Sequence, residues 1–196
     1  MSRRRWLSVA AALLLLTSIS ILYSRFSDER RGHLRELGSL EMAFVAREAD
    51  APGVVDTEVL RYSDRTYFDL SINITNRDGD VTLGNTQLTL YFEGVPVYEE
   101  GLHDIAVPSG SSRVIRLEDV PVKTETMDEV LKTTFQRADD SLAVSATLLV
   151  EYPFEVMDVV LYTYRLPLSS EGRILLTEIF GGKTQEEAAV EVLKLN

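Results

Sequence analysis

The chain has 196 residues, of which 45% are hydrophobic, and it carries a formal net charge of −11. It contains no cysteine, which excludes disulfides, zinc–thiolate sites and thiol nucleophiles. Residues 1–31 hold six arginines and two acids, so the rest of the chain holds 14 basic and 29 acidic side chains. Because contacts with phosphates need a basic face, we expect no nucleic-acid partner.

Residues 1–23 are expected to form a membrane anchor. Three arginines precede an uncharged run of 18 residues from Trp6 to Tyr23, which is near the lower limit for a helix that spans a bilayer. Trp6 and Tyr23 stand where aromatic side chains meet the two membrane interfaces. The apolar centre of the run contains Leu13, Leu14, Leu15 and Leu16.

Two interpretations of this run compete, a retained signal anchor and a cleaved signal peptide. Ser18-Ile19-Ser20 resembles a cleavage site, but the apolar run continues beyond it to Tyr23, which favours the anchor. The arginines at positions 3–5 favour a cytoplasmic N-terminus, although further arginines after Tyr23 weaken that bias. We therefore expect a single-pass protein of the cell membrane whose globular domain is extracytoplasmic.

Residues 24–38 are polar and charged and are interpreted as a juxtamembrane stalk, helical near Leu34 to Leu37 and interrupted at Gly32 and Gly38. Residues 39–180 are expected to form a β-sandwich domain. Residues 181–196 are expected to form a last helix after a hinge at Gly181-Gly182, because Thr184 and Glu187 form a capping pair.

Residues 67–101 contain the clearest strand pattern in the chain. Phe68 to Thr75 alternates apolar and polar residues, which is typical of a half-buried strand. A polar turn follows, the alternation resumes at Leu88 to Phe92, and Glu93-Gly94 reverses the chain into Val95-Pro96-Val97. This predicts three antiparallel strands in sequence order.

The flanking segments supply further strands, predicted at residues 40–44, 54–62, 113–120, 142–153, 159–166 and 173–179. Between two of them, Thr124 to Arg137 changes to helical spacing, with Thr126 and Glu129 as a predicted capping box. Seven to nine short strands separated by turns predict an all-β, antiparallel β-sandwich with one short inserted helix.

The order of these features resembles the late embryogenesis abundant group 2 domain, also called the water stress and hypersensitive response (WHy) domain, over roughly residues 40–168. The resemblance is carried by the strand that ends at Ile74-Thr75-Asn76, the hairpin at Leu90 to Val97, and the later strands. Members usually have Asn-Pro-Asn after the first long strand, whereas this chain has Asn76-Arg77-Asp78. The resemblance implies an immunoglobulin-like or fibronectin-like sandwich of a desiccation-related family without known catalytic residues.

Candidate chemistry is sparse, and we predict no catalytic site, no cofactor and no metal. His33 and His103 are expected to be solvated side chains rather than ligands, because a metal site needs convergent donors. Asn73-Ile74-Thr75 is a glycosylation sequon, although a chance occurrence is the stronger interpretation. Val95-Pro96-Val97 is a candidate edge strand for binding, since Pro96 removes a backbone donor and suits an edge.

Two hypotheses for function follow. The first is a non-enzymatic, membrane-tethered extracytoplasmic β-sandwich that acts by binding or protection at the membrane surface, as the resemblance implies. The second is an accessory or structural subunit of a membrane protein complex, with other membrane or envelope proteins as partners. A stable partner in a gentle detergent extract would favour the second.

Overall fold

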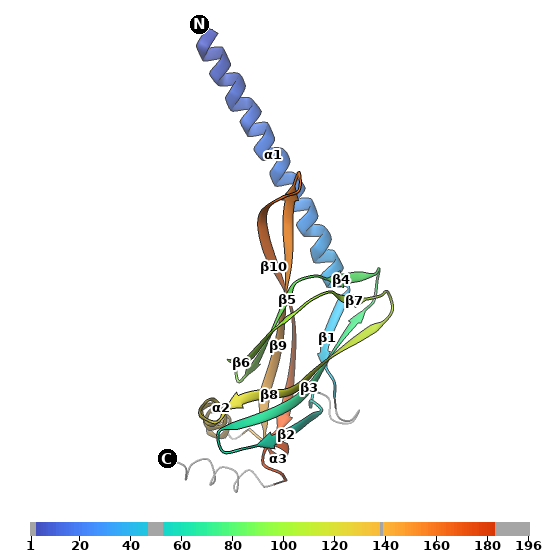
Figure 1. Ribbon diagram of the computed structural model, residues 1–196, viewed down its shortest axis with the longest axis vertical. Helices are drawn as coiled ribbons and strands as arrows, with labels where there is room; N and C mark the ends of the chain where they lie inside the picture. The colour runs from blue at the N-terminus through green and yellow to red at the C-terminus, as the bar shows by residue number, and fades with distance from the viewer. Residues whose placement is uncertain (1–2, 47–52, 138, 183–196) are drawn as a thin grey trace.

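The computed structural model describes residues 3–46, 53–137 and 139–182, with backbone alone for residues 3–9 (Figure 1). The chain is mostly β, in antiparallel sheets, with a long apolar helix at its N-terminus and few other helices. The predicted C-terminal helix lies outside the described residues. The elements in chain order are α1 (Arg3–Gly38), β1 (Leu40–Phe44), β2 (Thr57–Arg61), β3 (Arg65–Asn76), β4 (Val81–Leu83), β5 (Thr86–Phe92), β6 (Val95–Leu102), β7 (Ile105–Val107), β8 (Ser112–Lys123), α2 (Thr124–Gln136), β9 (Ser141–Val156), β10 (Val159–Leu175) and α3 (Leu176–Ile179).

Two four-stranded sheets contain most of the strands. In the first, the long strand β3 pairs with β1 and β2 along one side and with β8 along the other. The second sheet has the order β10-β9-β5-β6, and a small sheet joins β4 to β7. All of these pairings are antiparallel.

The alternation read in residues 67–101 is confirmed, but the predicted arrangement of its three strands is wrong. β5 and β6 form a hairpin, whereas β3 lies in the other sheet. The rings of Phe68 and Phe92 meet edge to face at 4.9 Å, so the buried faces of β3 and β5 meet at the core. Both rings are fully buried, because the alternating apolar residues of the two strands line a common interior.

Asn76 holds together the end of the first sheet and the small sheet. Its side chain is 1% exposed, and its Nδ2 donates to the carbonyls of Gly79 (2.7 Å) and Val107 (2.8 Å). Its Oδ1 accepts from the Ser39 hydroxyl and the Asp78 backbone N–H, each at 3.1 Å. Every polar atom of this amide is therefore satisfied, as burial requires.

The inserted helix predicted over Thr124 to Arg137 is confirmed as α2, but the predicted capping box is wrong. The helix begins at Thr124, two residues before the proposed cap, and no side chain caps it. The Thr124 hydroxyl instead donates to the Ser63 carbonyl at 3.4 Å, a tertiary contact that local sequence does not encode.

The two strands predicted at residues 159–166 and 173–179 are one strand, β10, followed by the short helix α3. Gly172 lies within β10, where a Cβ would stand 2.5 Å from a Val55 side-chain carbon and 3.1 Å from the Phe44 ring. Glycine here permits close packing of one layer on another and does not break the strand.

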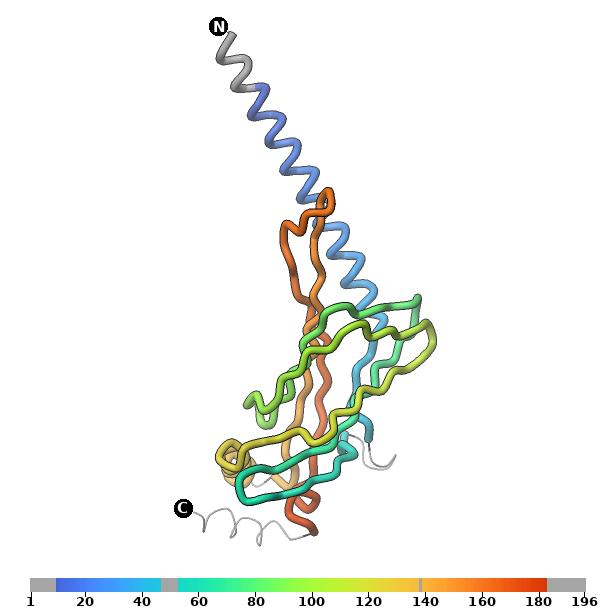
Figure 2. The backbone as a smooth tube through the Cα atoms, in the orientation of Figure 1, coloured from blue at the N-terminus to red at the C-terminus, as the bar shows by residue number. Residues whose placement is uncertain are grey.

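The predicted extent of helix in the stalk is wrong, since residues 24–38 are helical throughout and continue α1 without a break (Figure 2). Gly32 does not interrupt the helix, which ends at Gly38. The figures show α1 extending away from the sheets, with the β9–β10 hairpin lying beside its C-terminal half (Figure 1).

Candidate functional site

The N-terminal half of α1 is exposed and apolar. From Ala10 to Ile21 every side chain is exposed, and Leu13, Leu14, Leu15 and Leu16 are each between 58% and 70% exposed. The helical segment Ala10–Gly38 is long and apolar enough to cross a membrane, a property that a signal sequence shares. Tyr23 is also exposed, while the side chain of Trp6 lies outside the described part.

The C-terminal half of α1 has one face turned toward the domain. Five side chains on this face are half-buried or buried, namely Leu22, Phe26, Glu29, His33 and Leu37. Their spacing of three and four residues places them along one stripe of a helix. The sequence analysis missed this stripe because it mixes apolar, acidic and imidazole side chains and so has no simple hydrophobic period.

Phe26 makes the principal contact between α1 and the hairpin. Its ring lies edge to face with Phe154 at 5.2 Å, with Tyr164 at 5.5 Å and with Tyr162 at 6.1 Å. Phe154 belongs to β9 and the two tyrosines to β10, so one helical residue contacts both strands of the hairpin. Such aromatic pairs add about 0.5–1.5 kcal/mol each beyond area burial.

His33 makes the second contact between α1 and the hairpin, about two helical turns after Phe26. Its ring stacks on Tyr152 at 4.0 Å, and its Nδ1 is hydrogen-bonded to the Tyr164 hydroxyl at 2.5 Å. The prediction that His33 is a solvated side chain is therefore wrong. His103 is exposed, and its Nδ1 is hydrogen-bonded to Asn85 Oδ1 at 2.9 Å.

The two tyrosines that contact His33, Tyr152 and Tyr164, both have raised pKa values. Burial, followed by the charge of Glu36 and the neighbouring Tyr164, raises the pKa of Tyr152 to about 12. Burial and the charge of Glu29 raise the pKa of Tyr164, against the opposing charge of Arg30. In both cases burial is the largest cause and favours the neutral form of the phenol.

The predicted edge strand is at a sheet edge. Among the described strands, β6 pairs with β5 alone, so its other side has no hydrogen-bonded strand. Pro96 is exposed, whereas Val95 and Val97 are half-buried and pack on the core. Of the three residues proposed for binding, the two valines thus face the core, and Pro96 alone is exposed at this edge.

Asn73 occupies the middle of β3, opposite Ala43 of β1 and Val114 of β8. Its Nδ2 donates to Thr75 Oγ1 at 3.3 Å, and its Oδ1 is buried without a hydrogen-bond partner in the described structure. Glycosylation here, which remains a prediction, would have to break that contact within a central strand.

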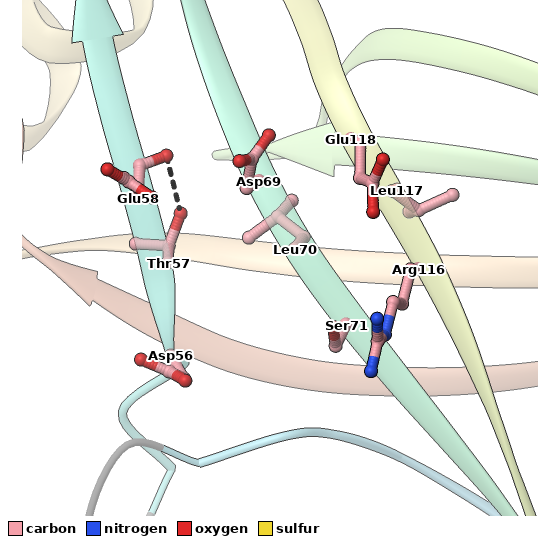
Figure 3. Close-up of a pocket in the computed structure, with 9 residues that line it drawn as sticks. All are labelled: Asp56, Thr57, Glu58, Asp69, Leu70, Ser71, Arg116, Leu117 and Glu118. Carbon is pink, nitrogen blue, oxygen red and sulfur yellow. Dashed lines mark hydrogen bonds between the residues drawn. The ribbon is translucent and has the colours of Figure 1, made fainter.

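The outer face of the first sheet carries a depression lined by β2, β3 and β8 (Figure 3). Asp56, Glu58, Asp69 and Glu118 supply carboxylates around it, and Arg116 supplies a cation. Asp69 accepts a hydrogen bond of 2.7 Å from the Asp119 backbone N–H, where the register with β8 shifts. Across the described residues, no group of three or more His, Cys, Asp or Glu side chains is placed to hold a metal ion.

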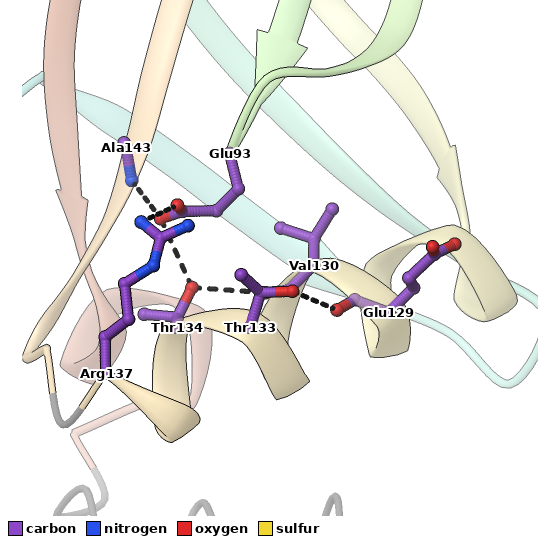
Figure 4. A network of polar contacts seen from close by, with 7 residues as sticks. All are labelled: Glu93, Glu129, Val130, Thr133, Thr134, Arg137 and Ala143. Carbon is purple, nitrogen blue, oxygen red and sulfur yellow. Dashed lines mark hydrogen bonds and ion pairs between the residues drawn. The ribbon is translucent and has the colours of Figure 1, made fainter.

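A second polar cluster surrounds Glu93, whose side chain is 3% exposed (Figure 4). Its carboxylate accepts from Arg137 Nη1 (2.7 Å), the Ala143 backbone N–H (2.9 Å) and the Thr134 hydroxyl (3.3 Å). These contacts connect the end of α2 with the β5–β6 turn and with β9. The buried carboxylate of Glu93 therefore has a structural role.

Together these features define the class of the protein, an antiparallel β domain carried on a long apolar helix that packs on one of its hairpins. No family model and no curated protein matches the chain. Among solved structures, a protein from Archaeoglobus fulgidus is similar at a TM-score of 0.33 and 12% identity, over 68% of this chain and 93% of that one. The Arabidopsis thaliana protein AT1g01470 is similar at a TM-score of 0.38 and 14% identity, over 63% of this chain and 79% of that one. Likenesses of this size bear on neither the fold nor the function of this chain.

Proposed function

We propose that the chain is a non-enzymatic, membrane-tethered protein whose extracytoplasmic, immunoglobulin-like β-sandwich acts by binding or protection at the membrane surface. One observation carries this proposal. The exposed apolar stretch of α1 continues as an unbroken helix into a stripe that packs on the β9–β10 hairpin. A helix fixed to its domain in this way suits a retained anchor, because cleavage near Ile21 would remove the segment next to that contact.

Two further observations support the parts of the proposal that concern fold and family. The buried faces of two four-stranded antiparallel sheets meet at the core, as in a sandwich. The order of strands and helix over residues 40–168 resembles the late embryogenesis abundant group 2 domain, whose desiccation-related members would supply a protective role. Fold-level resemblance alone does not establish function, so the activity needs a direct test.

The anchoring is tested by fractionating cells that express the full chain. We expect the protein in the alkali-resistant membrane fraction with its N-terminus intact, and digested by protease added to intact cells. Leu14→Arg with Leu16→Arg should release it, since each charge costs about 2.5–3.5 kcal/mol at a helix centre. Leu14→Ile with Leu16→Ile is the matched control and should stay in the membrane. A soluble product that begins near Ile21 would refute the anchor.

Protection is tested by drying and rehydrating dye-loaded vesicles that contain the full-length protein. We expect less dye leakage than from vesicles that contain an unrelated single-span protein at equal loading. Equal leakage from the two preparations would refute a protective action on the membrane itself.

The second candidate function is that of an accessory subunit of a membrane protein complex. The observation that favours it is the unpaired side of β6, since a free strand edge can accept a strand from a partner. Gentle detergent extraction would recover a stable complex in this case and a lone protein otherwise.

A further inference from the structure

The tip of the β9–β10 hairpin carries an apolar patch on the protein surface. Outside α1, eight large hydrophobic side chains are exposed among the described residues, and five of them lie within residues 157–162. These five are Met157 (93% exposed), Val159 (58%), Val160 (53%), Leu161 (54%) and Tyr162 (59%). Contiguous exposed apolar surface of this kind marks an interaction site, whereas single exposed residues do not.

The turn at the tip has an unusual composition for its geometry. Val156 pairs with Val159, so Met157 and Asp158 form a two-residue loop, and both have positive φ (52° and 63°). A turn of this kind strongly favours Asn-Gly, because bulky side chains are strained at positive φ. The chain instead places its most exposed large apolar side chain there, where solvent alone would favour a polar residue.

A bulge next to the turn adds to the patch. The register shifts between Val160 and Tyr162, which leaves Leu161 as an extra residue in β10. Bulges redirect side chains, and this one makes residues 159–162 exposed together although a regular strand would alternate. Asp158 is the one charged residue between Val156 and Tyr162.

The tip lies at the level of the end of the apolar run of α1. Phe26 contacts Phe154 and Tyr162, and Met157 is three residues beyond Phe154, or about 10 Å along an extended strand. On a helix, about 10 Å corresponds to about 6 or 7 residues, which leads from Phe26 to the neighbourhood of Ile19 and Ser20. The exposure of the α1 side chains agrees with this level for the tip. Counting from Ala10, Leu22 is the first side chain of α1 that is partly buried.

This level is where the bilayer interface must lie if α1 spans the membrane. The run of 18 residues from Trp6 to Tyr23 is about 27 Å long as a helix, so all of it is needed to cross a hydrocarbon core of about 30 Å. Tyr23 then stands at the interface on the domain side, and Arg25 follows at the level of the headgroups. The tip is beside these residues and shares their surroundings.

We propose that the hairpin tip, residues 156–162, inserts into the interfacial region of the leaflet from which α1 emerges and forms a second membrane contact. This inference rests on the proposed anchoring of α1. The occupant of the apolar patch is lipid because the patch is continuous with an apolar helix at membrane depth. A two-residue hairpin also satisfies its backbone hydrogen bonds almost to its end, which the low-polarity interface requires. Two contacts fix the tilt and rotation of the domain relative to the membrane.

The absence of cysteine from the sequence allows an unambiguous test with single labels on the full chain. Val160→Cys labels the tip, Leu16→Cys labels the apolar run of α1, and Ser109→Cys labels the exposed turn before β8. Each variant is coupled to an environment-sensitive fluorophore and reconstituted in phosphatidylcholine vesicles, with and without lipids that carry a nitroxide on the upper acyl chain. We expect several-fold stronger emission from labels at positions 160 and 16 than at 109, and quenching by the nitroxide at the first two alone.

The outcomes separate this inference from the anchoring on which it rests. Quenching at position 16 together with a solvent-like signal at position 160 would overturn the insertion and leave the anchor intact. No quenching at position 16 would overturn both. A label at position 160 that is shielded but not quenched by nitroxide lipid would show that a second copy of the chain covers the tip, which also overturns the insertion.

A charge at the tip provides an internal control. In the Val160→Cys background, Leu161→Asp should abolish the quenching, whereas Val114→Asp, at an exposed apolar position on β8, should leave it unchanged. Unchanged quenching in the Leu161→Asp variant would contradict apolar insertion of the tip.

Discussion

Asn76 provides the sharpest test of how this domain is held together. Replacing it by alanine removes four side-chain hydrogen bonds that join β1, β3 and the β4–β7 sheet. Asn73, three residues earlier on the same strand, is a matched control. It makes one long contact with Thr75, and its buried carbonyl oxygen has no hydrogen-bond partner in the described structure.

The magnitude follows from the partners of Asn76. The carbonyl of Val107, a fully buried residue, loses a donor, which costs about 1–3 kcal/mol. Gly79 and Asp78 lie in an exposed turn where water can replace the amide, so each loss costs about 0.5–1 kcal/mol. The Ser39 hydroxyl keeps a second acceptor, the Glu36 carbonyl, at 2.6 Å. Asn76→Ala should therefore destabilise the domain by about 2–5 kcal/mol.

Asn73→Ala should change the stability by less than about 0.5 kcal/mol, or increase it, because an unsatisfied buried oxygen is removed. The assay is denaturant unfolding of the full chain in detergent, followed by the circular dichroism of the β-sheets. The fluorescence of the one tryptophan, Trp6, would report on the anchor instead. A loss below about 1 kcal/mol for Asn76→Ala, or equal losses for the two variants, would refute the assignment of Asn76 as the residue that joins the sheets.

Asn76→Asp tests the same contacts through the direction in which the stability of the variant changes with pH. The new carboxyl would keep the acceptor for Ser39 and Asp78, but it would direct a second oxygen at the two carbonyls that the amide donates to. This raises the pKa of the carboxyl in the folded state, so the destabilisation should appear above the unfolded value of about 3.9 and grow as the pH rises. A variant that is least stable at low pH would contradict this geometry.

Two further predictions concern the interior and the hairpin. Leu148→Ala, at a fully buried position on β9, should lower the free energy of unfolding by about 2–5 kcal/mol. Val114→Ala, on the exposed face of β8, is the control and should lower it by less than about 0.5 kcal/mol. An equally small loss for Leu148→Ala would show that its side chain does not face the core. Tyr152→Phe should be neutral or stabilising at pH 7, because the Tyr152 hydroxyl is buried without a hydrogen-bond partner among the described residues. Since the pKa of Tyr152 is raised to about 12 in the fold, the unfolded chain loses its proton first, and the stability of the wild type falls as the pH rises from about 10 to about 12. Tyr152→Phe should reduce that fall, and an unchanged pH profile would show that Tyr152 ionises as it does in the unfolded chain.

Local patterns predicted those elements whose burial is itself periodic. β3 alternates buried and half-buried positions along nearly its whole length, so its strand was readable from Phe68 to Thr75. α2 buries Met127, Val130, Leu131 and Thr134 at helical spacing, so the change of period gave its extent almost to the residue. In both cases one face meets the core throughout, and sequence spacing reflects that face directly.

Features set by contacts between distant residues were not readable in this way. The first residue of α2, Thr124, contacts Ser63, whereas the predicted capping box at Thr126 and Glu129 does not form at the start of the helix. Residues 159–175 were predicted as two strands separated before Arg173, yet β10 continues through Gly172, where Val55 and Phe44 leave no room for a side chain. Both errors come from applying a local rule where a tertiary contact decides.

The hairpin tip did carry a local signal, one that conflicts with the rest of its strand. Residues 159–162 are four apolar residues in succession, which a strand with one solvated face would not contain. Taken alone, such a run predicts a strand buried on both sides, whereas here it is exposed on both. The run indicates a membrane contact only once β9 and β10 are seen to place it beside the apolar part of α1.

The continuity of α1 determines whether that placement can persist. A flexible stalk over residues 24–38 would let the domain turn freely, and the tip would meet the bilayer only in passing. As a helix the same 15 residues form a rod about 22 Å long, and Phe26 and His33 attach this rod to both strands of the hairpin. The tip is therefore held at a fixed distance along α1 from Tyr23. A helix break between the anchor and Phe26, such as Ser24→Pro, should release the tip from the membrane while the chain remains in it, which loss of nitroxide quenching at position 160 would report.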